Sequence, residues 1–328
     1  PARAPYAIAI WSHTMILAID IGGTQFGLAL ATPAGRVIKH IQHQTDRADH
    51  ADKRIDRILA ASKTLIAQSS VLACGIGFGG PVNFDTQRIV NSTHVVGWDD
   101  CPLPEIVEKH LGLPAIIDND ANVGALGEFT FGAGKNSRHI IYYTVSTGIG
   151  GGIIINGEIY RGGNGYAGEL GHVPILRDGP QCDCGNRGCL EALCSGTAIG
   201  KRATEAVQKH PRKGIAIART ANNNPITAKT LFDTARSGDP YARALVDEIC
   251  TDLGQGLAMA VNAFAPDVIV IGGGVSNAGH ILFEPLRRET LRFLMPVHRP
   301  SLRIAPAKLK NRSVLLGAVA LAKQRIQH

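Results

Sequence analysis

One short stretch carries the residues with the most specific chemistry. His172 is followed by Cys182, Cys184 and Cys189. One imidazole and three thiolates form the closed tetrahedral donor set typical of structural Zn²⁺ sites, and soft sulfur donors disfavour Mg²⁺, Ca²⁺ and Mn²⁺. The alternatives are thiols that cluster by chance and a disulfide, although a bridge between Cys182 and Cys184 would be badly strained. The stretch therefore predicts a zinc site.

Two carboxylates flank this predicted zinc loop, Glu169 on one side and Glu191 on the other. A metal ion that orders the loop also fixes both acids in space. Carboxylates held near one another suit a ligand with several hydroxyls, such as a sugar. The alternative is that both residues are surface glutamates without a ligand.

Three glycine-rich turns each follow an apolar run that has the pattern of a strand. They lie at residues 20–24, 146–150 and 272–276, and the first begins with Asp20. Such turns bring backbone N–H groups close to a small anion, and an acid at a strand end can hold a metal ion. The first two turns each join two strands, which predicts a duplicated α/β domain with one phosphate-binding turn from each half. The third turn suits a nucleotide base or ribose.

A run of polar residues follows another expected strand, at residues 115–117. This run contains Asp118, Asn119, Asp120 and Asn122, and a helix is expected after it. Open α/β sheets bind ligands at the carboxyl ends of their strands. Helix capping could account for one of these acids but accounts less well for the whole run.

An irregular stretch at residues 82–103 follows a pair of glycines, Gly79 and Gly80, that end a buried strand. Glycines at a strand end allow a close approach of backbone or ligand. The stretch carries Asn91 and Trp98. It could close over a pocket, or it could be an ordinary connection.

Composition and periodicity place these residues in an α/β protein. The chain has 328 residues, 45% hydrophobic and 19% charged, which allows one large or two medium soluble domains. Apolar periodicity predicts helices at residues 48–69, 104–110, 197–209, 226–236, 242–264 and 314–326. The net charge of +7 fits nucleic acid or anionic small ligands, but most Lys and Arg residues are scattered along the chain.

The location of the protein is indicated by its cysteines and its apolar runs. Seven cysteines, three of them in a metal pattern, predict a reducing compartment such as the cytoplasm. No apolar run reaches the roughly 18–20 residues of a membrane-spanning helix. Residues 1–14 hold an apolar patch that is too short for a convincing signal peptide. We therefore expect the natural start at Met15 and interpret residues 1–14 as a leader or a start-site extension.

In this order, these features resemble the ROK family (repressor, open reading frame, kinase) of sugar kinases. The resemblance covers nearly all of residues 15–327, and its most specific part is the zinc loop with its flanking acids at 169–191. It implies the actin-like ATPase (ribonuclease H-like) fold, with two α/β domains around a central cleft. The expected N-terminal domain is residues 15–118 plus 311–328, and the expected C-terminal domain is residues 119–310.

The resemblance also implies an ATP-dependent kinase that phosphorylates a hexose hydroxyl, most simply the 6-hydroxyl of glucose, with Asp120 as the general base. The implied substrate-binding residues are Asn119, Glu169, His172, Glu191, Gly80 and Asn91. The implied nucleotide-binding residues are Asp20, Gly22, Gly23, Thr24, Thr147, Gly148, Gly150, Gly273 and Gly274. ATP and Mg²⁺ are the implied cofactors, together with Zn²⁺ held by His172, Cys182, Cys184 and Cys189. Relatives are commonly dimers, so a homodimer is expected.

The sequence departs from the family where sugar identity is chosen. The pair Gly79 and Gly80 stands where many members have Pro-Gly, and Ser92, Thr93 and His94 replace the Pro-Asn region of many glucokinases. The Ser-Thr pair is similar to the residues that kinases of N-acetylated hexosamines have in this region. An N-acetylmannosamine or N-acetylglucosamine kinase is therefore the alternative substrate class.

Other members of the family suggest further alternatives. A non-catalytic sugar sensor need keep neither Asp120 nor all three turns, and this chain has them all. Kinases that use polyphosphate generally lack the zinc loop. Repressor members carry a DNA-binding winged helix before the first strand, whereas only residues 1–14 precede it here, so nucleic-acid binding is not expected.

Overall fold

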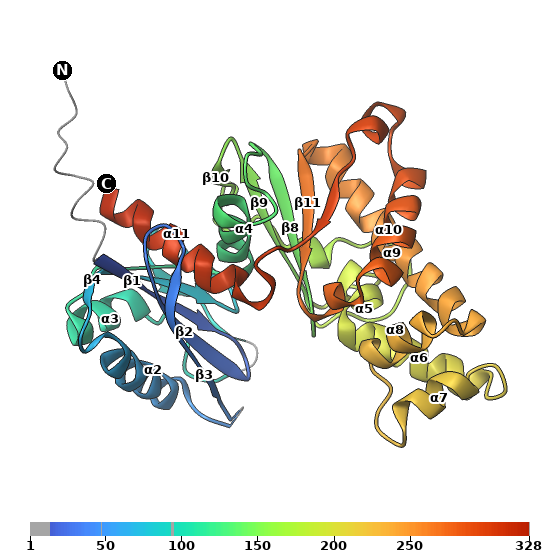
Figure 1. Ribbon diagram of the computed structural model, residues 1–328, viewed down its shortest axis with the longest axis horizontal. Coiled ribbons are helices and arrows are strands. Elements are labelled where there is room, and N and C mark those ends of the chain that lie inside the picture. The colour runs from blue at the N-terminus through green and yellow to red at the C-terminus, as the bar shows by residue number, and fades with distance from the viewer. Residues whose placement is uncertain (1–13, 47, 93–94, 328) are drawn as a thin grey trace. The chain divides into compact units, whose positions relative to one another are not determined.

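A computed structural model describes residues 14–46, 48–92 and 95–327 of the chain (Figure 1). Apart from Thr14, the expected leader at residues 1–14 lies outside the described residues. By its internal contacts the chain divides into two compact units. Unit 1 comprises Pro1–Lys135, Glu158–Ala167 and Asn311–His328, and unit 2 comprises Asn136–Gly157 and Gly168–Lys310. Residues 119–135 thus group with unit 1, whereas the sequence assigned them to the C-terminal domain.

The sheet of unit 1 has five strands in the order β3-β2-β1-β4-β7. These are β1 (Thr14–Ile21), β2 (Gln25–Ala31), β3 (Val37–Gln44), β4 (Ser70–Phe78) and β7 (Ala115–Asn119). The first three pair antiparallel, and β4 and β7 run parallel to β1. Because Ile21 lies opposite Phe78 and Phe78 opposite Asn119, the carboxyl ends of the three parallel strands meet at one edge. The predicted functional turns of unit 1 follow these ends.

Helices cover both faces of this sheet (Figure 1). Along β4, Cys74, Ile76 and Phe78 join a buried cluster with α2 (Ala51–Ile66) and α3 (Leu103–Leu111). The alternating glycines Gly75 and Gly77 instead face α11 (Ser313–Gln327). A Cβ atom at Gly75 would overlap the backbone of α11, so only glycine permits this close approach.

Helix α4 (Asp120–Phe131) packs closely against α11. Side chains at Gly127 and Gly317 would overlap the backbone of the opposite helix, so glycines again allow the two backbones to touch. This packing explains why residues 119–135 group with unit 1.

Unit 2 has a second mixed sheet. Its strands β9 (Ile149–Ile155), β8 (Ile140–Val145), β11 (Val268–Gly272) and β12 (Ile304–Pro306) lie side by side in that order. β8 and β9 form an antiparallel hairpin, and β11 and β12 run parallel to β8. The arrangement repeats that of β2, β1 and β4, as the two similar turns predicted. The short strand β10 (Glu158–Ile159) follows β9 and is grouped with unit 1.

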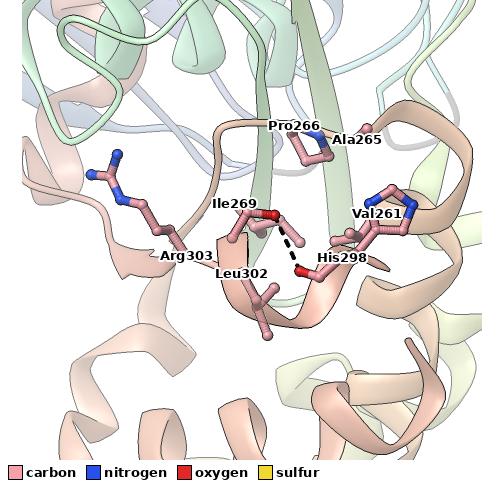
Figure 2. A pocket seen from close by; sticks show the side chains of 8 residues that line it. Val261, Ala265, Pro266, Ile269, His298, Leu302 and Arg303 are labelled. Carbon is pink, nitrogen blue, oxygen red and sulfur yellow. Dashed lines mark hydrogen bonds between the residues drawn. The ribbon is translucent and has the colours of Figure 1, made fainter. Parts of the chain in front are cut away.

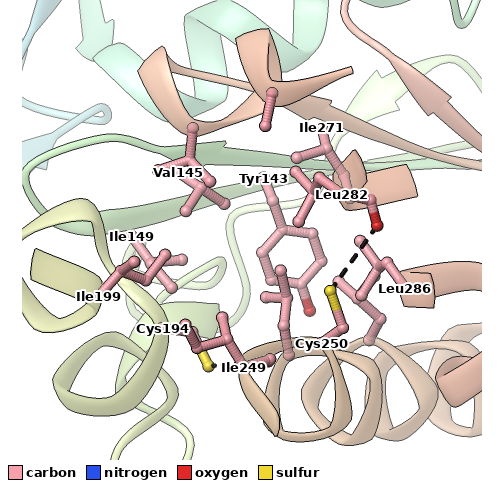
Figure 3. Close-up of a cluster of buried hydrophobic side chains, with 14 of the residues drawn as sticks. Tyr143, Val145, Ile149, Cys194, Ile199, Ile249, Cys250, Ile271, Leu282 and Leu286 are labelled. Carbon is pink, nitrogen blue, oxygen red and sulfur yellow. Dashed lines mark hydrogen bonds between the residues drawn. The ribbon is translucent and has the colours of Figure 1, made fainter. Parts of the chain in front are cut away.

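Six helices complete unit 2 among the described residues: α5 (Leu190–Cys194), α6 (Gly196–Lys209), α7 (Ile215–Ala221), α8 (Ala228–Arg236), α9 (Pro240–Phe264) and α10 (His280–Phe293). They enclose a buried core around Tyr143, Ile249 and Leu282 (Figure 3). Within this core the Cys250 thiol lies 3.7 Å from the Leu282 carbonyl and donates to it. Among the described residues, no helix is long and apolar enough to cross a membrane.

The structure corrects the expected helices at several places. The helix expected at 226–236 begins only at Ala228, because the Thr227 side chain caps it and accepts from Thr230 N. The sequence missed α10, whose interior contains Pro285, a residue that usually breaks a helical pattern. It also missed the short helix α7, which has no side-chain cap.

Candidate active site and metal centre

The first glycine-rich turn lies at the end of β1 in unit 1. Asp20 pairs with Gly27 on β2 and Gly77 on β4, so a residue without a side chain lies on each side of it. Gly22 N donates to Gln25 O at 2.9 Å and closes the hairpin. Gly79 N donates to Ile21 O at 2.8 Å, which brings the Gly79–Gly80 corner beside the turn. The structure thus gathers Asp20, Gly22, Gly23, Thr24 and Gly80 at one edge of the sheet.

The polar run after β7 supplies the start of α4. Asn119, not Asp120, is the helix cap: its Oδ1 accepts from Ala121 N at 2.9 Å and from Asn122 N at 3.3 Å. The Asn119 Nδ2 group also donates to Gly80 O at 3.1 Å. These bonds hold the predicted substrate-binding amide in one orientation against the Gly79–Gly80 corner. The Asp120 carboxylate lies next to the same corner, where a Cβ atom on Gly79 would be 3.3 Å from Oδ2.

Asp20 and Asp120 place two acids close to one another. Burial, and then the charge of Asp120, raise the pKa of Asp20 to about 7. A carboxylate that is both buried and next to a second acid is stabilised by a bound cation. This pair is therefore chemically suited to a divalent ion at Asp20 beside a proton acceptor at Asp120.

The sequence missed the residues that anchor this strand end. Asp118 is 2% exposed, and its Oδ2 accepts from Nε and Nη2 of Arg161 at 2.9 and 2.7 Å. Its Oδ1 accepts from Asn122 Nδ2 at 3.1 Å. The Arg161 guanidinium also lies over the Phe84 ring, 3.5 Å from its centroid. Asp118 is thus a structural anchor, and Arg161 joins the strand end to the 82–89 hairpin; the long sequence separation gave no local signal for this pair.

The loop after this hairpin contributes a buried side chain to unit 1. Trp98 is 1% exposed and packs edge-on against Phe78, with ring centroids 5.1 Å apart. It is therefore a core side chain of unit 1. The Asn91 backbone approaches Gly80, where an added Cβ would lie 3.3 Å from Asn91 O. Thr93 and His94, two of the residues at which the sequence departs from many glucokinases, lie outside the described residues.

The second turn, at the end of β8 in unit 2, is held by Glu191. The Glu191 Oε2 atom accepts from Ile149 N at 2.7 Å. A side chain at Gly148 would overlap this carboxylate. Gly196 N, at the start of α6, donates to Ser146 O at 2.6 Å. The predicted nucleotide-binding residues Thr147, Gly148 and Gly150 therefore lie in or beside a turn fixed by α5 and α6.

The third glycine-rich corner follows β11, the strand beside β8. Gly273 has a φ of +79°, and a side chain there would overlap the backbone of Val145 at the end of β8. Only glycine fits both conditions. Gly274 follows it, with open space where a side chain would lie. The second and third corners thus lie side by side at the carboxyl ends of neighbouring strands, where open α/β sheets bind ligands.

The four predicted zinc ligands come together in unit 2. The ligand atoms of His172, Cys182, Cys184 and Cys189 all lie within 4.8 Å of one another. Cys184 Sγ is 3.7 Å from Cys189 Sγ, and Cys182 Sγ is 3.5 Å from His172 Nδ1. A tetrahedral Zn²⁺ with ordinary bond lengths separates sulfur pairs by about 3.8 Å and a sulfur–nitrogen pair by about 3.5 Å. The donor set and its spacing fit Zn²⁺.

Metal binding to the cluster requires the loss of a proton. Burial raises the pKa of the Cys189 thiol to about 12, so a bare cluster would keep this proton. A bound cation would displace it, because metals bind the thiolate. The loop turns between its cysteines at Gly185 and Gly188, both with positive φ.

The imidazole of His172 connects the metal cluster to both flanking acids. Its Nδ1 faces Cys182 and lies 4.0 Å from Glu191 Oε1, whereas its Nε2 lies 3.9 Å from Glu169 Oε2. One ring nitrogen can therefore bind a metal while the other faces a ligand. The sugar-binding residues implied by the sequence are divided between the units: Gly80, Asn91 and Asn119 in unit 1, and Glu169, His172 and Glu191 in unit 2.

A small pocket in unit 2 contains none of these residues (Figure 2). It has a volume of about 30 Å³ and is lined by Val261, Ala265, Pro266, Ile269, His298, Ser301, Leu302 and Arg303. That volume holds about one water molecule. This pocket is therefore too small for a sugar or a nucleotide.

Comparisons with known proteins show the family and the fold. The ROK family profile matches residues 16–325. The chain is 36% identical over 323 residues to a glucokinase of Halalkalibacterium halodurans, covering 96% of both chains. It is 35% identical over 313 residues to a glucokinase of Thermotoga maritima, covering 95% of this chain and 98% of the relative. The crystal structure of a ROK family glucokinase from Streptomyces griseus in complex with glucose and AMPPNP superposes with a TM-score of 0.83, at 33% identity, covering 94% of this chain and 99% of that one. The predicted two-domain α/β fold is confirmed.

Substitution Cys184→Ser tests the metal centre. Loss of one thiolate should remove most of the zinc and lower the melting temperature, because structural zinc contributes directly to folding free energy. It should also raise the KM for a hydroxyl-rich substrate, since Glu169 lies beside His172. Metal content by mass spectrometry and thermal unfolding measure these effects. Cys101→Ser, outside the cluster, is the matched control, and full zinc content in Cys184→Ser would contradict the assignment.

Substitution Asp20→Asn tests the buried acid in the absence of metal and nucleotide. The raised pKa means that folding favours protonated Asp20, so its contribution to stability is lost as pH rises from about 4 toward 7. Asparagine cannot ionise, so the variant should melt several degrees above the parent at pH 8 and close to it at pH 4. Asp56→Asn, at an exposed position on α2, should change neither value. Equal shifts at both pH values would contradict the assigned pKa.

Proposed function

The chain belongs to the ROK family, and on this premise we propose that it transfers the γ-phosphate of ATP to the 6-hydroxyl of a hexose, with glucose as the preferred substrate. The observation that carries the proposal is the arrangement around Asp120, which lies at the start of α4 between the first phosphate turn and the Gly79–Gly80 corner. The glucose and AMPPNP complex of the Streptomyces griseus relative supports both substrates.

Asp120 is the proposed general base. Its carboxylate accepts the proton of the sugar hydroxyl as the oxygen attacks phosphorus. Such assistance is typically worth about 10²–10⁴-fold in rate. The cap formed by Asn119 and the anchor formed by Asp118 fix the backbone on both sides of the base. A base held in this way needs no reorientation during the reaction.

Each unit carries residues that bind the sugar in this proposal. Asn119, with Gly80 and Asn91 beside it, contributes polar groups from unit 1. Glu169, Glu191 and His172 contribute from unit 2, where the carboxylates accept hydrogen bonds from sugar hydroxyls. Zn²⁺ supplies no chemistry to the reaction and keeps the loop in place. The role of the ligands is to orient the ring so that one hydroxyl points toward phosphorus.

The nucleotide is held by backbone in this proposal. Within the turns at residues 22–24 and 147–150, the N–H groups of Gly23, Thr24, Thr147 and Gly148 are offered to the phosphates, and Gly273 and Gly274 leave room for the adenosine. Asp20 would hold Mg²⁺, which neutralises phosphate charge when bound. The homodimer and the cytoplasmic location are predictions.

The alternative substrate class rests on Ser92 and Thr93, which are similar to those of kinases of N-acetylated hexosamines. The other alternative is a sugar sensor without turnover. It is disfavoured because a sensor needs neither a proton acceptor nor three nucleotide corners.

A coupled ADP-release assay with Mg-ATP decides among these functions. The panel is glucose, mannose, fructose, allose, N-acetylglucosamine and N-acetylmannosamine. We expect the highest kcat/KM with glucose. Preference for an N-acetyl sugar would support the hexosamine kinase instead. No ADP release with any sugar of the panel, from folded and zinc-bound protein, would favour the sensor.

Substitution Asp120→Asn tests the base. The amide keeps the shape but cannot accept the proton, so kcat should fall by at least about 100-fold while sugar binding is retained. Steady-state kinetics and calorimetric titration with glucose measure the two effects. Asp85→Asn, at an exposed position of unit 1, is the control. Turnover near that of the parent would exclude Asp120 as the base.

A further inference from the structure

Arg54 is a charged side chain inside unit 1. It lies on α2 and is 1% exposed. Its Nη1 donates to Gly23 O at 3.0 Å, and its Nη2 donates to Asp46 O at 2.6 Å. Both acceptors are main-chain carbonyls, and one of them belongs to the first phosphate turn.

Burial of this guanidinium is unfavourable for the fold. A buried charge loses its hydration, and among the described residues the Arg54 Nε has no hydrogen-bond partner. The nearby carboxylate of Asp49 binds Lys53 and Arg57 instead, at 2.6 and 3.4 Å. Replacing buried charges by apolar side chains of similar volume is often neutral or stabilising. Packing alone therefore does not explain an arginine at this position.

Peptide geometry supplies an explanation. The C=O of one residue and the N–H of the next point in opposite directions across a trans peptide. By holding Gly23 O inward, Arg54 turns the N–H of Thr24 outward. Thr45 N holds the next carbonyl, Thr24 O, at 2.8 Å. Within the described residues, neither Gly23 N nor Thr24 N donates to a protein acceptor, and Thr24 is exposed.

We propose that Arg54 is a positioning residue for the nucleotide phosphates: it aims the Thr24 N–H at the anion and places a fixed positive charge behind the turn. The inference rests on the proposed function, in which residues 22–24 bind ATP. A positive charge close to an anion and shielded from water attracts it more strongly than the same charge in solvent. Arg54 therefore acts on the nucleotide and not on the sugar.

Substitution Arg54→Met removes the charge and both hydrogen bonds while keeping an apolar stem. We expect the KM for Mg-ATP to rise by about 10-fold or more, the scale of a lost charge-assisted hydrogen bond. The KM for the sugar at saturating ATP should stay within about twofold of the parent. Arg54→Lys keeps the charge, so its KM for Mg-ATP should lie between those of the parent and of Arg54→Met.

The matched control is Arg57→Met, on the same helix. Arg57 also donates to a main-chain carbonyl, Gln44 O at 2.8 Å, but this carbonyl lies outside the turn. The KM for ATP should therefore be unchanged in Arg57→Met. Calorimetric titration gives a second readout: Arg54→Met should weaken ATP binding and leave adenosine binding unchanged, whereas a general loss of structure would weaken both.

Two results would overturn the inference: a parental KM for ATP in folded Arg54→Met, or equal losses for ATP and adenosine. If Arg54→Met does not fold, the same measurements are made on Arg54→Lys. A parental KM for ATP in Arg54→Lys would then overturn the inference. Parent protein that phosphorylates no sugar would count against the proposed function. The ATP and adenosine titrations would then still test Arg54 separately.

Discussion

Turns that bind phosphate through their backbone depend on one constraint: for each N–H that faces the ligand, the preceding carbonyl must face the protein. Those carbonyls need partners, because a buried polar group without a hydrogen bond is costly. In unit 1 these partners are hydrogen-bond donors: Arg54 donates to Gly23 O, and Thr45 N donates to Thr24 O. In unit 2 the donor is a backbone group, since Gly196 N donates to Ser146 O.

In unit 2 the Glu191 side chain links the turn to the predicted metal centre. Glu191 binds Ile149 N through Oε2, while its Oε1 lies 4.0 Å from His172 Nδ1 and 3.9 Å from Cys182 Sγ. One carboxylate thus contacts the phosphate turn and borders the predicted zinc ligands. The loop before it, which carries the three cysteines, has little regular structure, so a bound metal ion would fix the conformation of this loop. Within this unit, the predicted metal centre and the proposed phosphate turn therefore share one carboxylate.

The sequence predicted what depends on local spacing and missed what depends on distant contacts. The zinc ligands and the glycine turns were predictable because each motif lies within a short segment of chain. The pairs Arg54–Gly23 and Arg161–Asp118 join segments that are 31 and 43 residues apart, so no local sequence pattern predicts these contacts. Asn119 was expected only as a substrate ligand, whereas its side chain also caps α4, since both roles require the same amide at a strand end.

The position of Asp120 depends on the whole of α4, including its far end. Glu128, in the last turn of this helix, is fully buried; it accepts from Ala133 N at 2.8 Å and from Ser313 Oγ at 2.8 Å. Ala133 precedes the point where the chain leaves unit 1 after residue 135, and Ser313 follows its return at residue 311. One buried carboxylate therefore ties both chain segments to the helix that carries the proposed base. These two hydrogen bonds fix the far end of α4 and so help to hold Asp120, at its start, in place.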